Sequence, residues 1–118
     1  MASECRSADA TVEADDALAV PTELLNTFNV SGMPKHELYL KPYMPVMLLR
    51  NLDPRAGLCN GTRLIVRRVI NGRLLEAQIA SAGEHQGDIV YFPRIQLIPE
   101  EVAFPWAWSR VHCPVCRA

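Results

Sequence analysis

Cysteine and histidine side chains near the end of this sequence are the groups best suited to metal or redox chemistry. Cys113 and Cys116 are separated by two residues, and His112 directly precedes the first of them. This spacing is typical of a zinc-ligand pair, but a structural zinc ion takes four ligands, and Cys5 and Cys59 are the only other thiols. We therefore keep a small zinc-binding interaction module that uses Cys113 and Cys116 as an alternative, and predict no metal. A redox pair is disfavoured, because no helix is expected after it to lower a thiol pKa.

Basic side chains form a second group, because cations bind phosphates electrostatically. Residues 1–32 carry six acids and one base, whereas residues 33–98 carry nine bases and five acids. A basic region beside an acidic leader permits contact with a polyanion, and a solvated surface is the alternative interpretation. The candidate DNA-binding residues flank one predicted hairpin or lie on nearby strands: Arg63, Arg67, Arg73, Lys41 and Arg94.

Other chemistry is not expected from this sequence. His36, His85 and His112 show no catalytic arrangement with a nucleophile or a carboxylate pair, so independent enzyme activity is not predicted. No apolar run approaches the roughly 20 residues of a membrane span, and the start lacks the features of a signal peptide. We predict an intracellular protein without membrane contact, nuclear if its source is eukaryotic.

Most of the elements that must position these side chains are predicted to be strands. Residues 1–20 lack periodicity, which predicts an irregular acidic leader, and residues 21–34 predict a short helix followed by a linker. Residues 35–99 then alternate in hydropathy, with Arg68 and Val69 breaking the alternation at an expected bulge. The dipeptides Asn60-Gly61 and Asn71-Gly72 mark tight reversals, so Asn60 and Gly61 are assigned to turn geometry. The pattern predicts a mainly β fold, a small, partly open barrel of the Src-homology-3-like or oligonucleotide-binding kind.

Aromatic residues are expected to serve packing. The predicted strands contain Tyr39, Tyr43, Tyr91 and Phe92, and we interpret them as core or rim residues instead of platforms for base stacking. The segment at 100–118 is predicted to be a tail, in which Phe104, Trp106 and Trp108 would leave apolar rings exposed.

One long stretch resembles a known family. The run PTELLNTFNVSGMPKHELYLKPYMPVMLLRNLDPRAGLCNGTRLIV, followed by FPRIQLIP, resembles the petite-integration-frequency (Pif-type) DNA helicases, especially those of Helitron transposons. Its most specific part is the series L-L-R-N-L-D-P and G-L-C-N-G-T-R between Leu48 and Arg63. The resemblance implies that residues 35–99 are the Src-homology-3-like accessory (2B) domain of such a helicase, inserted in its second motor domain. Within an intact protein this domain would guide single-stranded DNA during ATP-driven unwinding, in DNA repair or recombination.

The motor itself is not expected in this sequence. No stretch reads G-x-x-x-x-G-K-S or G-x-x-x-x-G-K-T, the loop that cradles nucleotide phosphates. The resemblance therefore implies that ATP and magnesium belong to the intact parent, with no cofactor and no ATPase activity in this chain. Its expected partners are DNA, in single-stranded form, and the missing motor domains, to which residues 100–118 would lead back. We interpret the sequence as a fragment, either a truncated or mispredicted gene product or a non-functional transposon remnant, with the C-P-V-C series then a product of drift.

Overall fold

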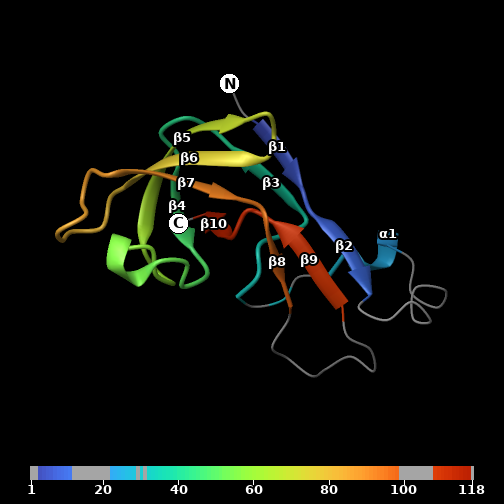
Figure 1. Cartoon of the computed structure of the whole chain (residues 1–118). Coiled ribbons are helices and arrows are strands. Elements are labelled where there is room, and N and C mark those ends of the chain that lie inside the picture. Colours follow the sequence, from blue (N-terminus) through green and yellow to red (C-terminus); the bar gives the residue numbers. More distant parts are fainter. Residues whose placement is uncertain (1–2, 12–21, 29, 31, 99–107, 118) are drawn as a thin grey trace.

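Figure 1 shows the arrangement of the elements in a computed structural model, which describes residues 3–11, 22–28, 30, 32–98 and 108–117. The described chain is mainly β with one short α-helix, as predicted. Its strands are β1 (Ser3–Arg6), β2 (Ala8–Thr11), β3 (Glu37–Leu40), β4 (Pro45–Leu48), β5 (Arg63–Ile70), β6 (Leu74–Ile79), β7 (Ile89–Pro93), β8 (Ile95–Leu97), β9 (Trp108–His112) and β10 (Val115–Arg117). The helices are α1 (Thr22–Leu25) and a 3-10 turn, η2 (Pro54–Ala56). None of the helices within these ranges is long and apolar enough to cross a membrane.

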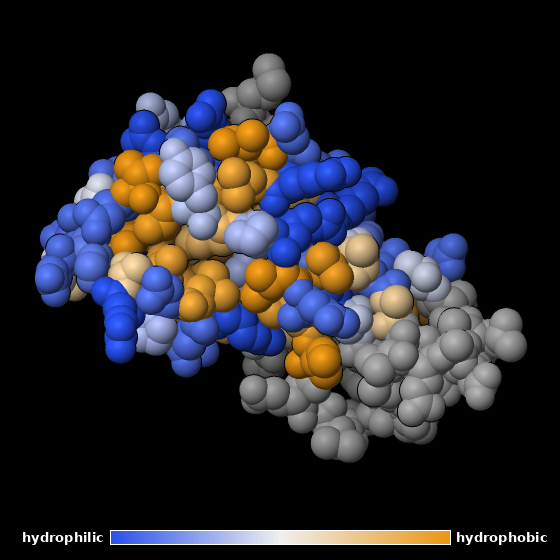
Figure 2. Space-filling view, viewed as in Figure 1, coloured by the Kyte–Doolittle hydropathy of each residue, from blue (hydrophilic) through white to orange (hydrophobic). Residues whose placement is uncertain are grey.

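The largest sheet has five antiparallel strands in the order β10, β4, β5, β6, β7. Its inner face buries alternate residues, such as Leu64 and Val66 of β5, which are at most 1% exposed. The pairing of β5 with β6 shifts register between Val66 and Arg68, which confirms the predicted bulge. Figure 2 shows one face of the molecule, on which hydrophobic residues gather over this sheet among hydrophilic ones.

Two smaller sheets contain the leader and the tail. In one, β1 pairs with β3, and in the other β9 lies between β2 and β8. The prediction of an irregular leader is therefore wrong for residues 3–11, and the residues described in the predicted tail, 108–117, form two strands. Local pattern could not reveal this, because the partners of these strands lie far away in the sequence. Across the described residues the three sheets do not close into a barrel.

The two ends of the chain are joined by a buried ion pair. Arg110 of β9 donates through Nε to Asp9 Oδ1 at 2.9 Å and through Nη2 to Asp9 Oδ2 at 3.0 Å, and both side chains are 0% exposed. The same guanidinium donates to the carbonyl oxygens of Leu25, Phe28 and Pro34 at 2.8–3.2 Å. One buried side chain therefore holds β2, the end of α1 and the following loop together.

Candidate functional site

The two predicted turns place the arginine-bearing strand. Asn71 and Gly72 have φ of 53° and 66°, and the Arg73 N–H donates to the Ile70 carbonyl at 3.0 Å, as in a two-residue hairpin turn with positive φ. At the start of β5, Gly61 has φ of 93°, and the Thr62 N–H closes the reversal on the Cys59 carbonyl at 3.0 Å. Gly61 thus lies in a tight turn that begins β5.

The strand β5 presents its arginines on the outer face of the sheet. Arg63 and Arg67 are exposed and stand four residues apart, about 13 Å along an extended strand. The bulge adds Arg68, which is also exposed, while Arg73 lies in the turn that joins β5 to β6. The outer face of β5 therefore carries two of the predicted cations, Arg63 and Arg67, together with Arg68, which the sequence indicated only as the position of a bulge.

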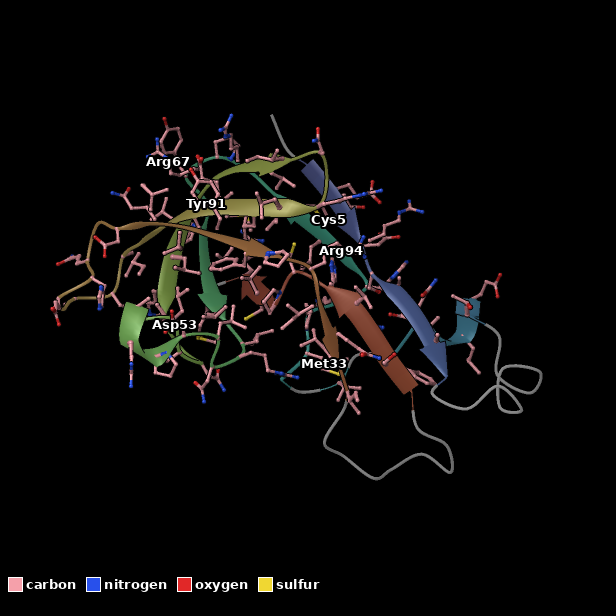
Figure 3. All side chains as sticks on the ribbon, in the orientation of Figure 1. Cys5, Met33, Asp53, Arg67, Tyr91 and Arg94 are labelled. Carbon is pink, nitrogen blue, oxygen red and sulfur yellow. The ribbon has the colours of Figure 1, made fainter. Side chains whose placement is uncertain are left out.

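A single carboxylate organises two of these arginines. Glu76 on β6 accepts a hydrogen bond from the Tyr91 hydroxyl at 2.8 Å and one from Arg67 Nε at 3.3 Å, and it lies 3.5 Å from Arg68 Nε. The Tyr91 hydroxyl lowers the pKa of Glu76, with further contributions from Arg68 and Arg67, so the carboxylate stays ionised. Figure 3 shows Arg67 and Tyr91 close together above the five-stranded sheet. We call these four residues the Glu76 cluster.

Beside this cluster lies a groove between β3, the turn at 41–44 and β10. Its volume is about 720 Å³, and its lining includes the exposed side chains of Lys35, Tyr39, Lys41, Tyr43 and Arg117. A smaller hollow of about 410 Å³ is lined by Tyr43, Arg67, Arg68 and Glu76. Because Tyr43 lines both, the two form one continuous area. We call its exposed cations and tyrosines the tyrosine–cation surface: Lys35, Tyr39, Lys41, Tyr43, Arg67, Arg68 and Arg117.

Tyr43 is the most exposed large hydrophobic residue of this surface, at 84%. Its backbone has φ of 69°, a left-handed conformation that costs a non-glycine residue on the order of 1 kcal/mol. The Tyr43 N–H donates to the Val66 carbonyl at 2.7 Å, and the Val66 N–H donates to the Met44 carbonyl at 2.9 Å. These bonds fasten the turn to β5 and hold an exposed aromatic ring between two groups of cations.

Three of the four aromatic residues that were predicted to lie in the core or at its rim are exposed. Tyr39, Tyr43 and Tyr91 are 57%, 84% and 53% exposed, whereas Phe92 is 1% exposed and belongs to the core as predicted. The alternation of Tyr39 with the buried Leu38 and Leu40 was a signal of its outward position. For Tyr43 there was no such signal, because the turn decides its exposure.

Arg94 lies apart from this surface. Its Nη2 donates to the carbonyl oxygen of Arg6 and, at 2.8 Å, to that of Val111. The guanidinium therefore bridges β1 and β9, and this predicted DNA-binding candidate is occupied in holding the smaller sheets together.

The predicted zinc alternative has no matching arrangement. Cys113 is buried, Cys116 is half-buried, and the structure assembles no group of three or more metal-ligating side chains within its described ranges. His112 is 0% exposed, and burial, with Arg94 nearby, lowers its pKa to about 4. The ring is therefore neutral near pH 7.

Comparison with known proteins shows a partial match to one family model. Residues 23–69, which include β3, β4 and most of β5, match the family model described as the 2B domain of the DNA helicase Pif1. Residues 23–69 are thus similar to a Pif1-type 2B domain. The matched segment holds six of the seven residues of the tyrosine–cation surface, all except Arg117.

Solved Pif1 structures share the fold. One match is a chain from a study of DNA unwinding at forked double-stranded DNA by two coordinating Pif1 helicases, with 16% sequence identity and a TM-score of 0.62. The alignment covers 98% of the present chain and 22% of that helicase chain. The present chain is 19% identical to Pif1 helicase from Candida albicans, with a TM-score of 0.63, 99% of this chain covered and 29% of that one. It is 17% identical to unliganded Pif1 from Bacteroides sp., with a TM-score of 0.63; the alignment covers 99% of the present chain and 32% of that one.

The sequence therefore spans less than a third of each of these helicase chains. A search of curated proteins found no match. The link to Helitron transposons and the roles in repair and recombination stay predictions.

Proposed function

We propose that this chain acts as the accessory 2B part of a Pif1-type DNA helicase, and that its tyrosine–cation surface contacts single-stranded DNA. The observation that carries the proposal is the placement of exposed tyrosines between exposed cations along one groove. A related helicase structure concerns unwinding at forked DNA, which supports DNA as the partner.

The chemistry of the surface suits a single strand better than a duplex. Cations such as Lys41 and Arg67 neutralise phosphates, while tyrosine rings stack on bases, and stacking contributes about 1–3 kcal/mol per base. Bases in a duplex are already stacked and present only their edges, so Tyr39 and Tyr43 would gain this contact only from an unpaired strand. Stacking needs no particular base, so the proposal predicts binding without sequence preference.

Glu76 sets the strength of the contact. Its carboxylate holds Arg67 and Arg68 at 3.3 and 3.5 Å and offsets one of their two positive charges. A phosphate would compete with this carboxylate for the guanidinium groups. The structure thus supports weak, readily reversible contact, which suits a part that guides a moving strand.

Hydrolysis of ATP is proposed for the motor domains of the intact helicase, where ATP and magnesium would bind. This chain would supply no nucleotide-binding loop, since its sequence contains none. In a eukaryotic cell we place the protein in the nucleus, with its DNA substrate.

The test is fluorescence anisotropy of labelled oligo(dT) with the purified chain at several salt concentrations. Replacing Arg67 and Arg68 together with alanine is expected to weaken binding about tenfold and to reduce the salt dependence, because each lost phosphate contact lowers the slope by about 0.7. Tyr43→Ala is expected to weaken binding by a similar factor without changing the slope, while Tyr43→Phe keeps the ring and the affinity.

Arg55 offers a matched control, because it is exposed on η2 outside the tyrosine–cation surface. Arg55→Ala should leave affinity within about twofold, since one remote cation contributes only to the general field. Equal losses for Arg55→Ala and for the Arg67 and Arg68 variant would refute the proposed surface. Equal affinity for oligo(dT) and for a duplex of the same length would refute the preference for single strands.

A further inference from the structure

Two buried thiols from opposite ends of the sequence lie in contact. Cys5 of β1 is 4% exposed and Cys113, which follows β9, is 0% exposed. Both side chains belong to the main core cluster, where Leu40 and Val115 also lie, and they interact with each other there. Both are free thiols. The DNA-binding proposal makes no use of this pair.

The surroundings give the two sulfur atoms different roles. The interaction with Cys113 and the nearby positive charge of Arg94 lower the pKa of Cys5 to about 7, although burial acts in the opposite direction. The same contact and burial raise the pKa of Cys113. Figure 3 shows Cys5 and Arg94 close together at the junction of the smaller sheets. Cys5 is thus the more readily ionised of the two thiols, and Cys113 is the less readily ionised.

We propose that Cys5 and Cys113 form an oxidisable dithiol site that hydrogen peroxide converts into an intramolecular disulfide. The Cys5 thiolate attacks one peroxide oxygen, the O–O bond breaks, and the leaving hydroxide takes a proton to form water. The Cys113 sulfur then attacks the sulfenic sulfur of Cys5, the S–O bond breaks, and the departing hydroxide leaves as water with the Cys113 proton. The two thiols lose two electrons together, and one peroxide becomes two waters.

Access to the site is through a short strand. β1 has four residues and, among the residues that the structure describes, pairs with β3 alone, so its outer edge is not part of a larger described sheet. Brief opening of such a short edge strand costs less than unfolding of the domain. Peroxide is small enough to reach Cys5 during these openings.

The pairing differs from the one that the C-P-V-C spacing indicates. Cys116 lies opposite Met47 in the pairing of β10 with β4, and both are half-buried. The neighbouring Val115 is 0% exposed and lies on the core side, with Cys113. Cys113 therefore has Cys5 as its partner, and Cys116 faces the other side of the sheet.

The experiment treats the reduced full chain with a small excess of hydrogen peroxide, blocks free thiols and maps tryptic peptides without reduction. The expected product links residues 1–6 to residues 111–117 with the loss of two hydrogens. Because the second peptide contains both Cys113 and Cys116, the map is repeated with Cys116→Ser, which should form the same link. Cys59→Ser is a second control with the same expectation.

The disulfide would close a loop of more than 100 residues, so the oxidised chain should melt about 10 °C higher than the reduced chain. Cys5→Ser should abolish both the link and the rise in melting temperature. A link within residues 111–117, links between molecules, or blocked thiols at both Cys5 and Cys113 after treatment would each overturn the proposal. If Cys5→Ser does not fold, peroxide treatment of the wild-type chain in urea gives the comparison, because loss of native contact should then scramble the pairing.

Discussion

Replacing Arg110 with methionine is expected to destabilise the fold more than any other substitution of a charged residue considered above. The guanidinium is fully buried and forms two hydrogen bonds to the Asp9 carboxylate at 2.9 and 3.0 Å. Methionine fills much of the same space but provides no donor. The variant would leave the Asp9 charge buried without its partner, together with three carbonyl groups that had accepted from the same side chain.

The expected loss follows from these contacts. Removing one partner of a buried ion pair costs about 3–5 kcal/mol, because the remaining charge is uncompensated. A domain of this size has a total stability of roughly 5–15 kcal/mol, so the variant is expected to lose a large share of it. With a urea m-value of about 1.5 kcal/mol/M, a loss of about 4 kcal/mol lowers the unfolding midpoint by between 2 and 3 M.

Equilibrium unfolding in urea, followed by circular dichroism, measures this shift. Arg6→Met is the matched control, because the ion pair of Arg6 with Glu4 is exposed, with side chains 66% and 37% accessible. Such surface pairs contribute less than about 1 kcal/mol. The double variant Asp9→Leu with Arg110→Met should recover part of the loss, since it removes the unpaired charge. If Arg110→Met and Arg6→Met shift the midpoint equally, the buried pair does not hold the sheets together.

Three other outcomes are expected. Burial lowers the pKa of His112 to about 4. The contribution of His112 to the free energy of unfolding should therefore be fully present above pH 6.5, and the free energy of unfolding should fall by at most about 3 kcal/mol as the pH drops from 6.5 to 4. In His112→Leu, this pH dependence of the urea midpoint should flatten. Gly57→Ala should cost about 1–2 kcal/mol in the same assay, because φ is 83° and the new Cβ would meet His85 at 3.1 Å, while Gly61→Ala, with φ of 93° and open space, should cost less. Glu76→Gln should strengthen oligo(dT) binding a few-fold at low salt, as measured by fluorescence anisotropy, because it frees Arg67 and Arg68 from a competing carboxylate. Weaker binding would contradict the role given to Glu76.

Local signals predicted the central part of the fold. The Asn71-Gly72 turn, the interrupted alternation at Arg68 and the short helix after Pro21 each depend on neighbouring residues, and each was confirmed. The leader was not predicted, because β2 pairs with β9 and Asp9 lies opposite Arg110, about 100 residues away. In the sequence, Asp9 is one more acid in an acidic stretch, and its burial depends on a partner that no local pattern indicates.

The candidate site, like the fold, was predicted from the sequence only in part. Lys41 and Arg67 were predicted from charge and do lie on the tyrosine–cation surface. The surface also includes Arg117, which reaches the groove only because β10 pairs with β4. Arg94 was indistinguishable from the other arginines in the sequence, since only the folded chain supplies the carbonyl groups that it binds.

The pairing of β2 with β9 and of β4 with β10 has a consequence for how the protein folds. Pairings between such distant segments close long loops, and folding slows as the average sequence separation of contacts grows. The hairpins of β5, β6 and β7 can form as soon as they are synthesised, and β4 can pair with β5, but β2 and the other edge of β4 must wait for residues 108–117. During that interval, strand edges and core residues stay uncovered, so this part of the nascent chain is most prone to aggregate just before β9 and β10 emerge.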